Sequence, residues 1–574
     1  MLHRFIENRV RQALTRLLPD ADPGAVQVQP CPDPRFGDYQ VNAIMALAKA
    51  RRLNPRQMAT DLLGHLDVAE ACEPPTVAGA GFLNFRLKAA AIASVLEAAA
   101  RGDHRFFVPA EKPRAIVVDF SSPNVAKAMH VGHIRSTILG DSLARIFRLL
   151  GHRVITDNHI GDWGTQFGKL LVGWKRHLDR AALERDSLAE MERLYRLINA
   201  ECEKDPVLLD LARQELLKLQ QGDPENRSIW QEMIDDSRHQ FDTIYDRLGV
   251  RFDHTLGESF YNPRLSTLID ELNRRGIAEE SDGARVVFFP EYPELKQHPA
   301  IVLKRDGAAN YTTTDLATLA YRLEAWQPDE IVYVTDGRQQ LHFKQLFAVF
   351  RRWQPEARVT LAHVWFGSIL GEDGKPFKTR SGEVIRLSDL LDEAEDRAFK
   401  VVSEKNPDLA EPVRREIASK IGLGALKYAD LLPNRQGDYV FSWDRMLALN
   451  GNTAPYLQYA YTRIRSIFRK SGLTPEQLAT APAFVLVEPD ELALAKQLLN
   501  FGLVLEGAAR EYRPNFLCNY LYDLAGLFAR FYENCPVLKA EEPARSTRLA
   551  LCELTARVLQ EGLDTLGIET PEQM

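Results

Sequence analysis

The sequence lacks a hydrophobic run long enough to cross a membrane. The longest alanine-rich stretch covers 12 residues from Ala89 to Ala100 and carries Glu97, whereas a spanning helix needs about 20 apolar residues. The first segment, MLHRFIENRVRQALTRLLPD, has a charge every three or four residues and no apolar centre, so it does not read as a secretory signal. We therefore expect a cytoplasmic protein without a membrane partner.

Cysteine is also scarce, with six residues in 574 and no CxxC pair. This usage excludes a disulfide scaffold, and we expect no metal site and no zinc. Hydrophobic residues at 45% and charged residues at 26% exclude a disordered or fibrous chain. The net charge of -7 rules out a wholly basic nucleic-acid coat protein, but it leaves room for an enzyme with a local basic patch.

A βαβ unit begins at Arg114. The apolar run RAIVVDF predicts a buried strand of a parallel sheet, the loop SSPNVAKAM follows, and HVGHIRSTILGDSLARIFRLLG has apolar residues at helical spacing. HRVITDN is the next strand. The fold class that this order predicts is α/β, with a doubly wound nucleotide-binding sheet.

The rest of the chain divides around this unit. Residues 1–108 predict a small α+β domain. Residues 109–370 hold the sheet, which a mostly helical insertion at about 174–300 interrupts. A strand, ARVVFF, is expected near residue 284, and the main sheet resumes with AIVLK, DEIVYVTDG and RVTLAHVWFG. Residues 371–450 and 451–574 are predominantly helical in pattern.

Two segments carry the chemistry. In PNVAKAMHVGH, His130, Gly132 and His133 open a helix after the first strand, where free backbone N–H groups favour a phosphate, and Lys127 adds a cation. Ordinary surface histidines are the alternative. In GEDGKPFKTRSG (371–382), three cations lie among glycines, in a form suited to closing over a triphosphate. A solvated basic loop is the alternative there.

Six ordered segments together resemble the bacterial arginyl-tRNA synthetases, a class I aminoacyl-tRNA synthetase family: SSPNVAKAMHVGHIRSTILGD, GDWGTQFG, YTTTDLATLAYR, GRQQLHFKQ, GKPFKTRSG and NTAPYLQYAYTRIRSI. The resemblance implies a Rossmann-type catalytic domain at 109–370, a signature loop and helical stem at 371–450, an N-terminal tRNA-contacting domain and a C-terminal anticodon-binding helical bundle. It also implies ATP-dependent ligation of L-arginine to its tRNA through an arginyl-adenylate, with Mg²⁺ accompanying ATP.

The resemblance assigns the ATP site to His130, Gly132 and His133, with His133 also beside the amino acid. The family's usual signature loop reads Lys-Met-Ser-Lys-Ser, whereas the aligned residues here are Phe377 to Ser381 and lack both lysines. Lys127 is thought to compensate in such enzymes. The division of catalytic work among Lys127, Lys378 and Arg380 is left open.

Arginine selectivity needs a carboxylate that faces a planar guanidinium. The resemblance gives this task to Tyr311 and Asp315, which lie four residues apart and so share one helix face. Further matching positions that would hold the ligand's α-amino and carboxylate ends are Asn124 and Gln339, with Ser122 beside Asn124. Asp119 is either another arginine-binding carboxylate or a strand-end cap.

The tRNA contacts are expected mainly at YLQYAYTRIRSIFRK (456–470), which has basic residues, interleaved aromatic rings and no acid. Its candidates are Arg463, Arg465, Arg469 and Lys470. Tyr39, in FGDYQ, is a further candidate in the N-terminal domain. A helix packed into a bundle core is the alternative for 456–470. We expect the protein to be a monomer.

Two other functions remain in competition with this one. A catalytically silent tRNA-binding paralogue would keep the fold but would be expected to lose His130, His133 or Asp315, and all three are present. A class I synthetase for cysteine or methionine would not need a carboxylate at Asp315, and a cysteinyl enzyme would carry zinc-ligand cysteines.

Overall fold

The computed structural model describes residues 1–377, 385–472 and 484–574. Contacts within the chain group these residues into two compact units. One unit combines Met1–Ala110 with Ala448–Met574, and the other is Glu111–Leu447. The functional division of the chain into four regions stays a prediction.

The unit Glu111–Leu447 is built on a parallel sheet of strand order β11-β10-β5-β6. The strands are β5 (Ala115–Phe120), β6 (Arg153–Asp157), β10 (Glu330–Val334) and β11 (Thr360–His363). All six residues of β5 are buried, because the strand is central and helices cover both faces of such a sheet. The expected α/β class and the βαβ unit are confirmed.

One strand assignment was wrong. AIVLK was expected in the parallel sheet, but β9 (Ala300–Leu303) instead pairs antiparallel with β8 (Ala284–Val287), which pairs with β7 (Glu279–Ser281). Residues along β9 alternate between buried and more exposed, as expected of a strand with only one covered face. The insertion therefore contains a small antiparallel sheet of its own.

Helix α5 (Val131–Leu149) connects β5 to β6. It packs closely against the sheet at Gly140, where an added Cβ would lie 2.2 Å from Cγ of Phe120. Most of α5 is buried, so this contact cannot relax outward into solvent.

Gly140→Ala is therefore expected to lower the free energy of unfolding by about 1–3 kcal/mol, because overpacking outweighs the gain in helix propensity. Gly526→Ala is the matched control, since Gly526 lies in helix α21 (Asn515–Asn534) and a Cβ there would meet nothing within 4 Å. Thermal unfolding of both variants checks this. A Gly140→Ala protein as stable as the control would contradict the packing argument.

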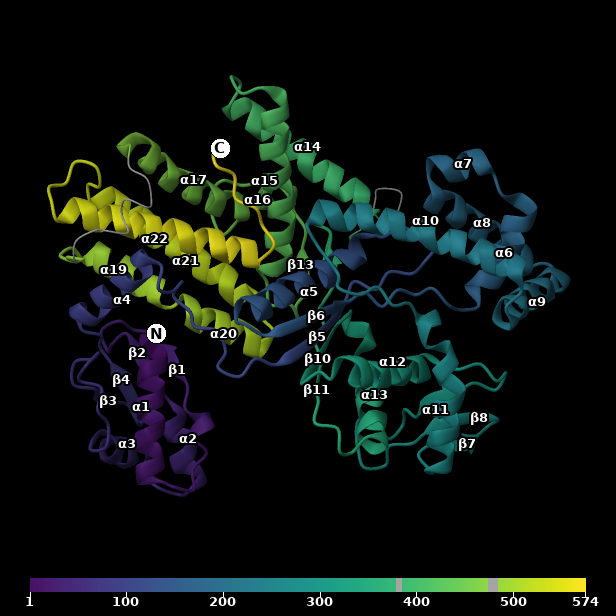
Figure 1. Ribbon diagram of the computed structural model, residues 1–574, viewed down its shortest axis with the longest axis horizontal. Helices are drawn as coiled ribbons and strands as arrows, with labels where there is room; N and C mark the ends of the chain where they lie inside the picture. Colours follow the sequence, from purple (N-terminus) through teal and green to yellow (C-terminus); the bar gives the residue numbers. More distant parts are fainter. Residues whose placement is uncertain (378–384, 473–483) are drawn as a thin grey trace. The chain divides into compact units, whose positions relative to one another are not determined.

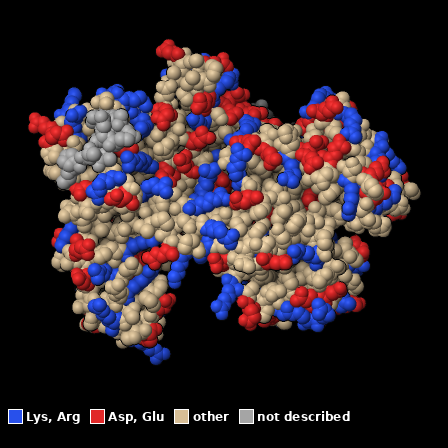
Figure 2. Space-filling model, in the orientation of Figure 1, with Lys and Arg blue, Asp and Glu red and all other residues tan. Residues whose placement is uncertain are grey.

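The insertion is mostly a set of helices: α6 (Gln166–His177), α7 (Arg180–Arg185), α8 (Ser187–Cys202), α9 (Pro206–Gln221) and α10 (Pro224–Leu248). Their charged side chains pair with one another, as in the ion pairs Lys175–Glu215, Arg180–Glu232 and Arg193–Glu190. Figure 2 shows the same mixture of signs over these helices, so they present no large basic surface on that face.

Further elements of this unit lie around the sheet. They are η2 (Glu258–Tyr261), α11 (Asn262–Arg274), α12 (Tyr311–Trp326), η3 (Gly337–Gln339), α13 (Gln340–Trp353), β12 (Ile369–Leu370), α14 (Leu387–Lys405), α15 (Glu411–Leu431), β13 (Tyr439–Val440) and α16 (Trp443–Met446). A continuous apolar core joins α11, α12 and α13 to the sheet.

The other unit combines an α+β part with a helical part. A four-stranded antiparallel sheet of order β1-β2-β4-β3 packs with the N-terminal helices. Its elements are α1 (Leu2–Leu17), η1 (Pro23–Ala25), β1 (Val28–Pro30), β2 (Tyr39–Val41), α2 (Ala43–Ala50), α3 (Pro55–Leu63), β3 (Thr76–Ala78), β4 (Phe82–Phe85) and α4 (Ala89–Arg101).

The helical part comprises α17 (Ala454–Ser471), α19 (Pro489–Leu499), α20 (Phe501–Glu511), α21 and α22 (Ala544–Thr565). Among the described residues, Pro489–Glu511 is the one stretch whose length and apolar composition would suffice to cross a membrane. Its leucines Leu494, Leu498 and Leu505 are fully buried here, which is how a core helix of a folded unit packs.

Candidate active site

Two histidines form the N-terminal cap of α5. Nδ1 of His130 accepts a hydrogen bond from the backbone N–H of Gly132 (3.0 Å), and Nδ1 of His133 accepts one from the backbone N–H of His130 (3.0 Å). An added Cβ at position 132 would lie 2.8 Å from Cε1 of His130. A side chain at position 132 would therefore force the His130 imidazole to move from its place in the cap.

Both imidazoles are neutral at physiological pH. Burial, together with the neighbouring His130 imidazole, lowers the pKa of His133 to about 3. Burial and the Arg338 guanidinium lower the pKa of His130 as well. Because each Nδ1 accepts a hydrogen bond, each neutral ring carries its proton on Nε2. The pair thus offers two uncharged N–H donors for phosphate oxygens, and any positive charge must come from other residues.

One such residue is Lys127, which is exposed and whose ammonium lies 5.8 Å from the ring centroid of Tyr195 on α8. The other predicted cations, Lys378 and Arg380, lie outside the described residues. The segment that follows them is fixed to the start of α5, because Ile385 O accepts from Val131 N (3.0 Å) and Leu387 N donates to Met129 O (2.9 Å). Ile385 and Leu387, which follow the predicted signature loop in the sequence, therefore lie beside the start of α5.

The loop after β5 has a strained backbone. Ser121, Ser122 and Ala126 adopt left-handed conformations, with φ of 72°, 50° and 63°. Each such residue costs on the order of 1–3 kcal/mol, and strain of this kind concentrates at functional sites. A hydrogen bond from the Ser121 N–H to Ser136 Oγ (2.9 Å) helps to hold the strained backbone in place.

The carboxyl ends of the parallel strands bring most of the predicted arginine-binding residues to one edge of the sheet. Asn124 and Ser122 follow β5, and Gln339 follows β10, with Asn124 and Gln339 exposed. Ligands of open α/β sheets bind at this edge. Tyr311, the first residue of α12, is 68% exposed, and Asp315 lies one turn further along the same helix.

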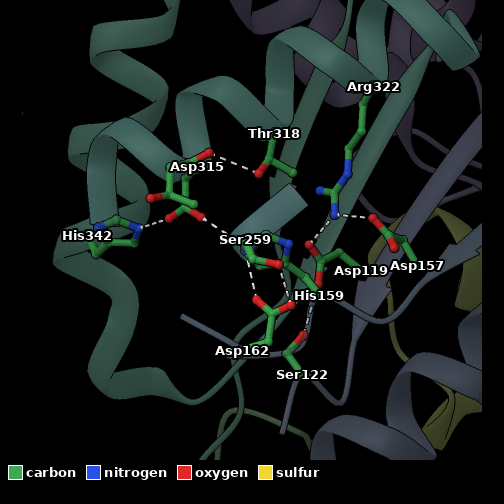
Figure 3. A network of polar contacts seen from close by, with 11 residues as sticks. Asp119, Ser122, Asp157, His159, Asp162, Ser259, Asp315, Thr318, Arg322 and His342 are labelled. Atoms are coloured by element: carbon green, nitrogen blue, oxygen red, sulfur yellow. Dashed lines mark hydrogen bonds and ion pairs between the residues drawn. The ribbon is translucent and has the colours of Figure 1, made fainter. Parts of the chain in front are cut away.

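Two histidines flank the Asp315 carboxylate (Figure 3). His342 Nε2 is 2.5 Å from Oδ2, and His159 Nε2 is 4.0 Å from Oδ1. Burial acts to raise the pKa of Asp315, but the hydrogen bond from His342 and the charges of His342 and His159 outweigh it, so the pKa lies below its ordinary value. Asp315 is therefore an ionised carboxylate in a largely enclosed site.

Asp119 has an internal partner. Its Oδ2 accepts from Nη2 of Arg322 (2.6 Å), which also donates to Asp157 Oδ2 (2.7 Å), and its Oδ1 accepts from Ser122 (3.2 Å). Arg322 is fully buried. Asp119 is thus at least a structural ion-pair partner, and a role toward arginine would be shared with Arg322.

Sequence reasoning missed His159, Asp162, Glu258, Arg322 and His342. Asp162 accepts hydrogen bonds from the N–H and Oγ of Ser259 (2.8 and 2.6 Å). Burial raises the pKa of Glu258 to about 7, and the charges of Asp315 and Asp162 act in the same direction. A signal existed for some of them, because Arg322 and His342 stand inside YTTTDLATLAYR and GRQQLHFKQ.

The predicted RNA-binding residues differ in their exposure and in the contacts they make. Tyr39 is 2% exposed in β2, so its assignment as a tRNA contact was wrong: the ring packs inside the N-terminal sheet. Arg465 pairs with Glu553 (3.1 Å), and Arg469 donates to the Glu572 carbonyl (3.1 Å). Arg463 stacks over the Tyr532 ring at 4.6 Å.

Lys470 is exposed at the end of α17.

Among the described residues, no group of three or more His, Cys, Asp or Glu side chains has an arrangement that could hold a metal ion.

Comparison with known families covers almost the whole chain. Residues 4–87 match the family described as the arginyl tRNA synthetase N terminal domain. Residues 95–443 match the catalytic domain of class I tRNA synthetases (R), and residues 457–574 match the DALR anticodon binding domain.

Individual relatives agree with these matches. Arginine–tRNA ligases of Shigella sonnei (strain Ss046) and Escherichia coli O157:H7 are each 46% identical over 580 residues, which covers 100% of both chains. The solved arginyl-tRNA synthetase of Thermus thermophilus is 28% identical with a TM-score of 0.85, and it covers 100% of both chains. That of Plasmodium falciparum is 28% identical with a TM-score of 0.83, covering 100% of this chain and 99% of the other.

Proposed function

The chain belongs to the arginyl-tRNA synthetase family of class I enzymes, and we propose that it charges tRNA in two steps at the sheet edge described above. Membership makes it an enzyme that joins arginine to tRNA, and the resemblance seen in the six sequence segments is confirmed. The arginyl-adenylate, the use of ATP and the individual residue roles are the proposal.

The observation that carries the proposal is the ionised, largely enclosed carboxylate of Asp315 at the ligand-binding edge of the sheet. A guanidinium is the cation that such a carboxylate holds with geometric selectivity. Tyr311 would flank the ligand's aliphatic stem. Asn124, Ser122 and Gln339 would hold its α-amino and carboxylate ends. Asp119, paired with Arg322, would add negative charge nearby.

ATP would bind at the start of α5. The Nε2–H groups of His130 and His133 would donate to phosphate oxygens, Gly132 would keep the helix mouth open, and Lys127 with Lys378 and Arg380 would supply positive charge. Mg²⁺ would arrive with the nucleotide, and no protein ligand is required of the described residues.

In the first step, an oxygen of the arginine carboxylate attacks the α-phosphorus of ATP and pyrophosphate leaves. In the second, a ribose hydroxyl of the terminal adenosine attacks the arginyl carbonyl and AMP leaves. No covalent enzyme intermediate is needed. The chain contributes position and stabilisation of phosphate charge.

For tRNA, we propose that the exposed part of α17, including Lys470 and the Arg463–Tyr532 pair, contacts the anticodon stem-loop. Phe36, which is 55% exposed in the loop before β2, replaces Tyr39 as the aromatic candidate in the N-terminal domain. We also propose a monomer that works in the cytoplasm.

Arginine-dependent ATP–pyrophosphate exchange, run with and without tRNA specific for arginine, tests the proposal. Exchange only with tRNA is the expected result, because the family resemblance implies that tRNA completes the site. Exchange without tRNA would keep the two-step chemistry but remove that coupling. A folded protein that shows no exchange in either condition would favour a silent paralogue.

A further inference from the structure

His342 joins helix α13 to the proposed arginine site on α12. It lies in the first turn of α13, three residues after Gln339, and its Nε2 is 2.5 Å from Oδ2 of Asp315. Only about a quarter of either side chain is exposed, 25% for His342 and 23% for Asp315. Figure 3 shows the imidazole approaching the carboxylate from the side opposite to His159.

This contact has a consequence for orientation. A hydrogen bond to Oδ2 fixes the rotation of the carboxylate. Oδ1 lies 4.0 Å from His159 Nε2, which is beyond hydrogen-bond distance, so His159 does not occupy this oxygen. A guanidinium needs a carboxylate whose plane is set in advance, because its N–H donors form a rigid fork.

The contact also has a consequence for charge. An imidazolium and a guanidinium are both cations, and both are stabilised by the same carboxylate. In an enclosed site of low dielectric constant, two cations on one carboxylate repel each other strongly. Binding of one therefore weakens binding of the other, and the effect is reciprocal.

We propose that His342 is a positioning residue for arginine, which orients Asp315 and, in the arginine-free enzyme, carries a proton that is released to solvent when the guanidinium binds. This inference rests on the proposed role of Asp315. The guanidinium takes the place of the proton as the positive charge beside Asp315, and neutral His342 keeps its Nε2–H donated to Oδ2.

The groups around His342 and Asp315 support this replacement of the proton by the guanidinium. Burial acts to lower the pKa of His342, but the hydrogen bond and charge of Asp315 outweigh it and raise the pKa above its ordinary value of 6.5. The charged or titratable groups that face this pair from the neighbouring elements are Asp315 and Arg322 on α12, His159 after β6, Glu258 in η2, Tyr333 on β10 and His363 on β11. Of these, Glu258 is a second candidate source of a proton near neutral pH.

The direction of the pH dependence follows. Below the raised pKa, the free enzyme holds the proton and arginine must displace it. Arginine affinity is thus expected to fall as the pH is lowered through that pKa, by up to about tenfold per pH unit, while kcat at saturating arginine changes little.

Isothermal titration of the full-length enzyme with L-arginine, in two buffers of different ionisation enthalpy, counts the protons released. The wild-type enzyme is expected to release roughly one proton near neutral pH. His342→Gln is expected to lose this release and to keep most of its affinity at high pH, since glutamine can donate to Asp315 without titrating. His342→Ala is expected to raise KM for arginine by about tenfold at high pH without a matching loss of kcat, because orientation is lost, and its KM should no longer rise as the pH is lowered, because no proton has to be displaced.

Two variants separate the alternatives. His363→Gln is the matched control, because the pKa of His363 is lowered to about 4 by burial and by the Arg435 and His342 charges, so it holds no proton to release. A His342→Gln enzyme that releases as many protons as the wild type overturns the inference, and loss of release in Glu258→Gln would then identify the carboxyl as the source.

The remaining outcomes distinguish this inference from the proposed function. A wild-type enzyme that releases no proton on binding arginine between about pH 6 and pH 8 also overturns the inference, and this result needs no variant to fold. Asp315→Asn that binds arginine normally would instead overturn the proposed role of Asp315 itself.

Discussion

Asp315→Asn is expected to reduce kcat/KM for arginine by about 10²- to 10⁴-fold. An amide carries no charge for the guanidinium, and its NH₂ group would face either the ligand's N–H donors or the Nε2 of His342. Removing one partner of a desolvated charge pair costs about 3–5 kcal/mol, and each 1.4 kcal/mol corresponds to about a factor of ten. The loss should appear mainly in KM for arginine, with KM for ATP unchanged.

Pyrophosphate exchange in the presence of tRNA specific for arginine, measured at varied arginine and varied ATP, separates the effect on KM for arginine from the effect on KM for ATP. Glu324→Gln is the matched control, because it removes the same charge from the same helix at an exposed position that pairs with Arg264. Its activity is expected to stay within about twofold of the wild type, since surface pairs contribute little. Equal losses in the two variants would point to a general effect on α12, and an active Asp315→Asn enzyme would remove Asp315 from the site.

The sequence predicted the parts of the fold whose signal is local. The βαβ unit was readable because RAIVVDF is apolar throughout and the following segment has helical periodicity. AIVLK was assigned to the wrong sheet because four apolar residues in a row do not specify a partner strand. Pairing of β9 with β8 depends on contacts between separate segments, and the spacing of hydrophobic residues within one segment does not predict them.

The sequence predicted several residues of the site, but it did not predict which side chains contact one another. His342 follows Asp315 by 27 residues, and only the packing of α13 beside α12 brings them into contact. Tyr39 was misjudged because β2 is only three residues long, too short to show the alternation that turns its ring inward. Arg322 was missed because a long cationic side chain on an amphipathic helix is ordinarily exposed, whereas here it is fully buried.

That burial leads to the largest stability effect expected in this chain. Arg322→Met keeps the length of the side chain but removes the guanidinium that pairs with both Asp119 and Asp157, which are also buried. Breaking a buried pair from one side costs about 3–5 kcal/mol, because an uncompensated charge stays behind. Here two carboxylates would be left facing each other, so the loss in the free energy of unfolding should lie at the upper end of that range.

The deficit should depend on pH. Burial raises the pKa of Asp157 above its ordinary value even with Arg322 opposing it, and loss of Arg322 would raise it further. A carboxyl whose pKa is higher in the folded than in the unfolded protein stabilises the fold only while it is protonated, and this stabilisation is lost as the pH rises through the folded pKa. Arg322→Met should therefore be closer to the wild type at about pH 5 than at about pH 8.

Denaturant unfolding at both pH values measures this deficit, with Arg264→Met as the control. Arg264 is partly exposed and pairs with Glu324, so its loss should cost at most about 1 kcal/mol at either pH. Adding Asp157→Asn to Arg322→Met removes one of the opposed charges and should recover part of the stability, although Asp157→Asn alone should be destabilising. Such a change of sign in a double-mutant cycle is a property of interacting charges and not of lost packing volume. A double variant less stable than Arg322→Met would show that packing, and not charge, fixes Arg322 beneath the arginine site.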